Sequence, residues 1–324
     1  MLARIPVCVL AVYASGCGLL LDIGLDDADA ASTHDAAGAD AALDAGVDAA
    51  AGDGGLLPRC VVWSAFEAPE ELVEVNSAAV DYSPSLTADM LEIYFASARD
   101  GGEDLWVARR RSVADPFDAP VRVEELNTED SEQDPDIRPD GLEMFFSRSG
   151  GGIWQAQRAA RGEPFGPAVR LEIAFAVEAP TSYGGPSLAA DGSLYFSVGP
   201  YSPPDHDLWI AKVTAGMLAG GPLLSTSDHE GFPSISSAGL DLYFDARRAG
   251  EMGLWVVRRR DTTVPFVFDE ATQLFETTFP GYTDQDPDIS PDGSTLCFDV
   301  DTGSGGLFDI WCAQRTCTRF ADAL

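Results

Sequence analysis

Short apolar runs separated by polar turns recur along this chain five times, with a period near fifty residues. Each unit opens with a proline, and ten or eleven residues later a phenylalanine lies in an apolar run such as 194–196 or 242–244. A tryptophan follows in a third segment, as in 104–109. A repeat of this length predicts stacked supersecondary units. Its anchors are Pro84, Pro135, Pro186, Pro233 and Pro287, then Phe95, Phe146, Phe196, Phe244 and Phe298, then Trp106, Trp154, Trp209, Trp255 and Trp311.

Polar turns divide each unit into strands. Residues 140–141, 191–192 and 292–293 are Asp-Gly pairs, which are strong hairpin signals, while 89–90 and 238–239 are weaker versions. The run that carries the phenylalanine is too continuously apolar to have one wet face, so we expect it to be buried between two layers. A fourth strand follows the Pro-Phe turns at 116–117, 164–165 and 265–266. The pattern predicts an all-β fold, a five-bladed β-propeller of four-stranded antiparallel blades.

The repeat region begins and ends inside a blade. Phe66, followed ten residues later by Asn76, copies Phe117 and Asn127, which belong to a fourth strand. The last unit stops after its third strand. We therefore expect the N-terminal strand to complete the last blade, which would close the ring and leave no terminal edge strands.

Two cysteines lie at the expected junction. Cys60 precedes Phe66 by six residues and Cys317 follows Trp311 by six, whereas the tryptophan and phenylalanine of an intact blade are eleven residues apart. The two cysteines thus map to consecutive positions of one loop, and we predict a disulfide between them. Closing so long a loop could contribute roughly 4 to 5 kcal/mol on a chain-entropy estimate.

Cys297 and Cys312 lie on adjacent predicted strands of the last blade. They form either a second disulfide or two buried thiols, and the spacing leaves both alternatives open.

The N-terminus has the features of a targeting segment. Arg4 precedes an apolar stretch over 5–14, and the sequence Ala-Ser-Gly-Cys follows at 14–17. This resembles a bacterial lipoprotein signal over residues 1–17, which implies lipid attachment at Cys17. The alternatives are an ordinary secretory peptide or a short membrane anchor. Gly18, in place of an acidic residue, implies by the same resemblance a bacterial cell-envelope location at the outer membrane.

Residues 18–57 consist largely of Ala, Asp and Gly and cannot bury a core, so we expect a disordered tether. Its aspartates lack the alternating ligand pattern of a calcium loop. The β-propeller then occupies residues 58–324. A net charge of −33 argues against nucleic acid as a partner. The basic triplets at 109–111 and 258–260 recur with the repeat and are interpreted as a solvated rim or as a docking patch for an acidic partner.

The last unit carries the fullest repeat signature. Residues 287–293 read Pro-Asp-Ile-Ser-Pro-Asp-Gly and residues 309–311 read Asp-Ile-Trp. They resemble the WD-like propeller repeat of the TolB type, and the likeness extends over all five units. It implies a propeller and an envelope protein. The chain departs from TolB in having five predicted units instead of six and no preceding α/β domain, so a similar fold transfers better than a partner or a role.

Motifs for catalysis or cofactor binding are few. No HExxH, nucleophile elbow, phosphate loop or paired CxxC occurs. Of three histidines, His34 lies in the tether, while His206 and His229 lie in predicted loops beside Asp205, Asp207 and Asp228. The simpler interpretation is that these two histidines are solvated loop residues. The more specific alternative is that they form a metal site with the neighbouring aspartates. We expect no cofactor and no metal.

Carboxylates offer a candidate site. Asp134 and Asp136 enter the first strand of one blade, and Asp286 and Asp288 enter that of another, so all four could line the central channel. An acid and base pair there would suit a glycoside hydrolase-like enzyme. Their repetition favours a structural role, because catalytic carboxylates need different environments. We therefore expect a monomeric binding or scaffold propeller that recognises an envelope protein, peptide or glycan and touches the membrane only through its lipid anchor, with the enzyme as the alternative.

Overall fold

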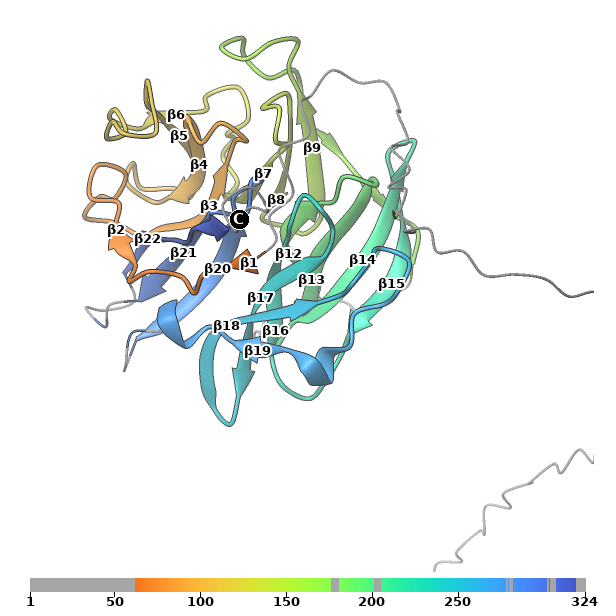
Figure 1. The fold of residues 1–324 in the computed structure, drawn as a ribbon. Coiled ribbons are helices and arrows are strands. Elements are labelled where there is room, and N and C mark those ends of the chain that lie inside the picture. The colour runs from red at the N-terminus through yellow and green to blue at the C-terminus, as the bar shows by residue number, and fades with distance from the viewer. Residues whose placement is uncertain are drawn as a thin grey trace, which may run out of the picture. The chain divides into compact units, whose positions relative to one another are not determined.

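The computed structural model shows an all-β, five-bladed propeller in a compact unit that spans Gly55–Leu324. It describes residues 62–175, 181–200, 205–277, 279, 282–301, 303 and 307–318. The sheets are arranged around a common axis (Figure 1). Cys17, Cys60, His34 and the tether lie outside the described residues, so the predictions made for them stay predictions. No helix among the described residues has the length and apolar character needed to cross a membrane.

Each blade runs outward from an inner strand. Blade 1 contains β3 (Asp81–Leu86), β4 (Glu92–Ser97), β5 (Asp104–Arg109) and β6 (Val121–Arg122). Blade 2 contains β7 (Glu132–Ile137), β8 (Glu143–Arg148), β9 (Ile153–Gln157) and β10 (Val169–Arg170). Blade 3 contains β12 (Thr181–Leu188), β13 (Ser193–Pro200), β14 (Asp207–Thr214), β15 (Met217–Leu224) and the added β11 (Glu172–Ile173). Blade 4 contains β16 (Glu230–Ile235), β17 (Asp241–Arg248), β18 (Glu251–Arg258) and β19 (Thr272–Gln273), with short 3-10 turns η1 (Phe268–Glu270) and η2 (Phe275–Thr277) beside it. Blade 5 contains β20 (Thr283–Ile289), β21 (Thr295–Asp301), β22 (Phe308–Gln314) and the N-terminal β2 (Glu70–Glu71).

The repeat anchors form one cross-strand pair in every blade. The phenylalanine of the second strand lies directly opposite the tryptophan of the third, and all five phenylalanines are fully buried. The predicted burial of the second strand is therefore confirmed. The pairs are Phe95 with Trp106, Phe146 with Trp154, Phe196 with Trp209, Phe244 with Trp255 and Phe298 with Trp311.

The core is divided among the blade interfaces. Each of five hydrophobic clusters joins residues of two neighbouring blades. One cluster packs Phe95 of blade 1 against Cys297 and Ile310 of blade 5, so the ring is continuous across the chain ends. Burial of apolar surface between blades is thus what holds the ring together.

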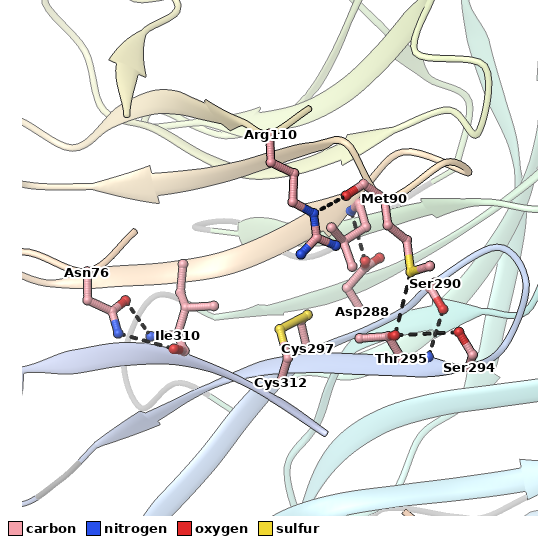
Figure 2. Close-up of a disulfide and its surroundings, with 11 residues drawn as sticks. Asn76, Met90, Arg110, Asp288, Ser290, Ser294, Thr295, Cys297, Ile310 and Cys312 are labelled. Carbon is pink, nitrogen blue, oxygen red and sulfur yellow. Dashed lines mark hydrogen bonds between the residues drawn. A yellow bond between two sulfur atoms is a disulfide. The ribbon is translucent and has the colours of Figure 1, made fainter. Parts of the chain in front are cut away.

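The N-terminal strand completes blade 5, as predicted. β2 pairs antiparallel with β22. Asn76 Nδ2 donates to Ile310 O at 3.1 Å, and Ile310 N donates to Asn76 Oδ1 at 2.8 Å (Figure 2). Asn127 makes the same two hydrogen bonds with Leu105 in blade 1, at 3.0 and 2.8 Å. The offset that Phe66 and Asn76 share with blade 1 therefore marks an equivalent strand.

A disulfide joins Cys297 and Cys312, which lie opposite each other on β21 and β22 (Figure 2). Of the two alternatives that the sequence left open, the bridge is correct. Cys317 is also disulfide-bonded, and it lies on β23 (Cys317–Thr318) opposite Trp63 of β1 (Val62–Trp63). Its predicted partner, Cys60, is outside the described residues.

Blade 3 departs from the predicted four strands. β14 continues into β15 through a tight turn in which Ala215 and Gly216 have φ of 49° and 77°. β15 is therefore a full strand of eight residues, and its outer edge accepts β11 in parallel, giving five strands. No Pro-Phe turn precedes the outer strand of this blade, which is why the repeat pattern did not reveal it.

The basic triplets are not simply a solvated rim, contrary to that interpretation. The guanidinium of Arg110 stacks on Phe117 at 4.4 Å and donates to Met90 O at 2.8 Å (Figure 2). Arg259 repeats both contacts with Phe266 and Gly239. The middle arginine of each triplet therefore braces a hairpin turn against the outer part of its blade.

Candidate functional site

The five inner strands β3, β7, β12, β16 and β20 enclose a channel. Near its middle the channel narrows to a cavity of about 30 Å³ lined by all five repeat prolines and the residues on either side of them, except Ser85. On one side it widens into a cavity of about 580 Å³ where the inner strands end, here named the strand-end mouth. On the other side it widens into about 440 Å³ where the inner strands begin, here named the strand-start mouth.

The constriction has the same backbone in every blade. The residue before each proline has positive φ and lies in a β-bulge, which lets proline occupy an inner strand without breaking a ladder hydrogen bond. Such a conformation is costly for a residue other than glycine and persists where the surroundings fix it. The residues and φ values are Ser83 at 50°, Asp134 at 51°, Gly185 at 51°, Phe232 at 44° and Asp286 at 49°.

The residue after each proline makes one bond to the next blade. Its side-chain oxygen accepts a hydrogen bond from a backbone N–H of the neighbouring inner strand, and together the five bonds form a closed ring. Serine suffices for this bond in three blades, and aspartate makes it in two. The bonds run from Ile137 N to Ser85 (3.0 Å), Leu188 N to Asp136 (3.0 Å), Ile235 N to Ser187 (3.1 Å), Ile289 N to Ser234 (3.0 Å) and Leu86 N to Asp288 (3.0 Å).

Asp136 and Asp288 therefore each have a second carboxyl oxygen that the ring of hydrogen bonds does not use. In each, only Oδ2 accepts a hydrogen bond from the described residues, and both side chains line the strand-end mouth. Burial raises the pKa of Asp136 well above its usual value, and the charge of Asp288 raises it further. Burial raises the pKa of Asp288 to about 7. Near neutral pH the carboxyl of Asp288 can therefore both donate and accept a proton.

Asp134 and Asp286 lie on the other side of the prolines, in a second acidic group. Ser83 Oγ is 3.0 Å from Asp134 Oδ1 and 2.5 Å from Asp286 Oδ2. A hydroxyl has one proton to donate, so both contacts are satisfied together only when one carboxyl is itself protonated. Burial raises the pKa of Asp286 well above its usual value, and neighbouring Asp299 and Asp134 raise it further. Burial likewise raises the pKa of Asp299 to about 8.

The two histidines are buried, so the prediction that they are solvated is wrong. Their rings lie 5.5 Å apart, centroid to centroid. His229 Nε2 is 3.0 Å from Asp245 Oδ1, and His206 Nε2 is 2.7 Å from Ser182 Oγ. Burial lowers the pKa of His206 to about 4. No group of three or more His, Cys, Asp or Glu side chains suited to a metal ion is present among the described residues.

The structure thus places all four candidate carboxylates on the channel but divides them into two groups. Sequence reasoning missed Ser83, which bridges Asp134 and Asp286, and Asp299, whose Oδ1 accepts from Ser83 N at 3.2 Å. Aligning the units would have shown that Ser83 precedes a repeat proline, as Asp134 and Asp286 do. Asp299 directly follows the repeat phenylalanine Phe298, but nothing in the repeat shows that it reaches blade 1.

No protein-family model and no curated protein sequence matches the chain. Solved structures do. An α-L-arabinofuranosidase from Podospora anserina, solved in complex with cellotriose, is 9% identical over 80% of this chain and 98% of that one, with a TM-score of 0.53. An α-L-arabinofuranosidase from Lactobacillus brevis is 10% identical over 78% and 96%, with a TM-score of 0.51. TolB from Acinetobacter baumannii is 16% identical over 75% of this chain and 56% of that one, with a TM-score of 0.45. At these identities the arabinofuranosidases share the fold with this chain, and no more follows.

Proposed function

We propose that the chain is a binding propeller of the cell envelope that holds a glycan at the strand-end mouth. The observation that carries the proposal is the use of aspartate at two of five equivalent ring positions. Because serine makes the same inter-blade bond elsewhere, the second oxygens of Asp136 and Asp288 are available to a ligand. A glycan presents hydroxyls that are donors and acceptors at once, and the carboxyl of Asp288, with a pKa of about 7, can serve both.

The rest of the strand-end mouth suits the same ligand. Its volume of about 580 Å³ lies within the usual range for small-molecule sites. Arg138, Glu143 and Gln155 add polar groups at its wall, while the half-buried Leu188 and Val213 add apolar surface for the carbon face of a sugar ring. Propellers of the same fold include an arabinofuranosidase solved with bound cellotriose, so the architecture is compatible with an oligosaccharide.

Replacing Asp136 and Asp288 together by serine tests this site without breaking the ring. The serines should keep both inter-blade hydrogen bonds, so the free energy of unfolding should stay within about 1 kcal/mol of that of the parent. Binding of oligosaccharides, with xylotriose and cellotriose as first probes and an array of envelope glycans beside them, should fall at least tenfold in calorimetry. Ser85→Ala is the matched control, because it removes a ring bond and no carboxylate, and Ser85 does not line the strand-end mouth, so it should lower stability and leave affinity unchanged. Undiminished binding by the double serine variant would contradict the proposal.

The glycoside hydrolase-like enzyme remains the second candidate, because two carboxyls with raised pKa line one mouth. Asp288, with a pKa of about 7, would be partly ionised near neutral pH and could act as acid or base, with Asp136 as its partner. Release of reducing sugar by the purified chain, abolished in the double serine variant, would favour this candidate over binding alone.

We further propose that a lipid on Cys17 anchors the chain at the outer membrane. The lipoprotein-like segment at 1–17 supports this location. So does the disulfide between Cys297 and Cys312, because structural disulfides are typical of compartments outside the cytoplasm.

Cys17→Ser should shift the chain from the membrane fraction to the soluble fraction and abolish metabolic labelling with a palmitate analogue. Cys317→Ser is the control, since it removes a disulfide-bonded cysteine and leaves the lipid site intact. Unchanged fractionation and labelling of the Cys17 variant would exclude the anchor.

A further inference from the structure

The strand-start mouth is a second cavity, on the opposite side of the constriction from the site proposed above. All five blades contribute to its lining. Its volume of about 440 Å³ is large enough for a small organic group. Neither Asp136 nor Asp288 reaches it, so it is chemically independent of the strand-end mouth.

Its walls combine carboxyl groups with aromatic rings. Glu103, Asp134, Asp286 and Asp299 line the cavity, and no lysine or arginine does so among the described residues. Tyr82, Tyr183, Phe232 and Phe308 line it as well, and each of these four rings is half-buried, so part of its surface remains open. Aromatic faces attract cations through their quadrupole, and carboxylates attract them directly.

Three buried polar atoms in this lining have no hydrogen-bond partner among the described residues, namely Tyr82 Oη, His206 Nδ1 and Asp286 Oδ1. Asp286 is 8% exposed and its Oδ1 accepts no hydrogen bond, while His206 is also 8% exposed and its Nδ1 is unsatisfied. Buried polar atoms are almost always paired, so unpaired atoms at a cavity wall indicate a ligand that supplies the missing contact. A hydrogen-bond donor is the group that Asp286 Oδ1 lacks.

We propose that the strand-start mouth binds an organic cation, an alkylammonium or guanidinium group. Such a group donates to Asp286, is neutralised by the carboxylates and lies against the aromatic rings. A bare metal ion fits less well, because no set of three ligating side chains is assembled among the described residues and aromatic walls offer it no ligands.

Calorimetric titration of the purified full chain with n-butylguanidinium tests the proposal, with n-butylurea as its neutral isostere. Saturable binding of the cation, at least tenfold tighter than that of the urea, is the expected result. Equal affinity for the two compounds, or no saturable binding of the cation, would overturn it. Calcium chloride is titrated in parallel, and calcium binding that excludes n-butylguanidinium and is insensitive to loss of an aromatic ring would also overturn it.

Variants at the rim connect the binding to this mouth. Glu103→Gln keeps the shape and removes one charge, and Phe308→Leu removes one ring. Each should weaken n-butylguanidinium about fivefold. Glu124→Gln removes an equally negative but exposed side chain of the outer part of blade 1 and should change nothing. Glu103 and Phe308 are half-buried, so these variants should fold even where a change at Asp286 does not. Wild-type affinity in both rim variants would refute the assignment.

The source of the cation is decided by a further comparison. A capped Ala-Arg-Ala tripeptide that binds more tightly than n-butylguanidinium would identify the arginine or lysine side chain of a protein partner. Tighter binding of the free compound would identify a small amine or guanidine metabolite.

Discussion

Replacing Asn76 by alanine should lower the free energy of unfolding by about 2 kcal/mol, because Ile310 is fully buried and its N–H loses the side-chain oxygen that accepts from it. Ile310 O loses one of its two donors and keeps Leu72 N at 3.0 Å. It should also release the segment that completes blade 5. That segment is joined to β22 by hydrogen bonds and packing and by no direct peptide link, so native-state proteolysis should begin within residues 62–76. Urea unfolding followed by tryptophan fluorescence measures the first effect. Limited digestion with thermolysin measures the second, because residues 62–76 contain apolar cleavage sites and no lysine or arginine for trypsin.

Asn127→Ala is the matched control for this prediction, because it breaks the same two bonds with Leu105 in blade 1. This variant should lower the free energy of unfolding by a similar amount without exposing the N-terminal segment, since the outer strand of blade 1 is connected through the chain to the strands before and after it. In a Cys317→Ser background the loss caused by Asn76→Ala should grow, because a disulfide-bonded residue beside β1 is also gone. Identical digestion patterns for the two alanine variants would show that closure does not limit the stability of the ring.

Raising the pH from 5 to 8 should destabilise the propeller. Burial raises the pKa of Asp284 and Asp288 to about 7 and that of Asp299 to about 8, against about 4 in an unfolded chain. The native state therefore holds protons that the unfolded chain releases. The stability from these groups is complete below pH 4 and is lost as the pH rises towards 8. The expected loss is at least about 3 kcal/mol, or roughly 6 to 12 °C in Tm for a domain of this size.

Thermal unfolding at matched ionic strength checks this prediction. Asp299→Asn removes one of the groups and should narrow the difference in Tm between pH 5 and 8. Asp191→Asn is the control. Burial raises the pKa of Asp191, but hydrogen bonds with Lys212 and Ser193 outweigh this effect and lower the pKa to about 2. Asp191 is ionised in both states across this range, so its variant should keep the full difference. An unchanged difference in the Asp299 variant would mean that the buried carboxyls do not govern the pH dependence.

The two acidic groups also bear on how the propeller could work. They lie on opposite sides of the proline ring, and Asp136 and Asp288 face one mouth while Asp134 and Asp286 face the other. The constriction between them leaves only about 30 Å³. A ligand of the size expected at either mouth does not pass through, so the two sites are separately addressable by mutation.

Part of the candidate site was accessible from the sequence. The positions of Asp134, Asp136, Asp286 and Asp288 on inner strands followed from the repeat, and so did the channel location. Their separation into two groups did not follow, because residues two apart on a regular strand point the same way, whereas the bulge before each proline changes their relation. Positive φ at a non-glycine residue before proline is a feature that no composition rule would have suggested.

The sequence by itself determined the five blades, the strands that carry the repeat phenylalanines and tryptophans, and the closure of blade 5 through Phe66 and Asn76. These features are local and copied from unit to unit, so a period of about fifty residues makes them visible. Only the tertiary structure decided that Cys297 and Cys312 are bridged, that blade 3 gains β11 and that Ser83 joins carboxylates from two other blades. Each of these features occurs once in the molecule. They depend on contacts between residues far apart in the chain or on the orientation of two side chains, and the repeat carries no information about either.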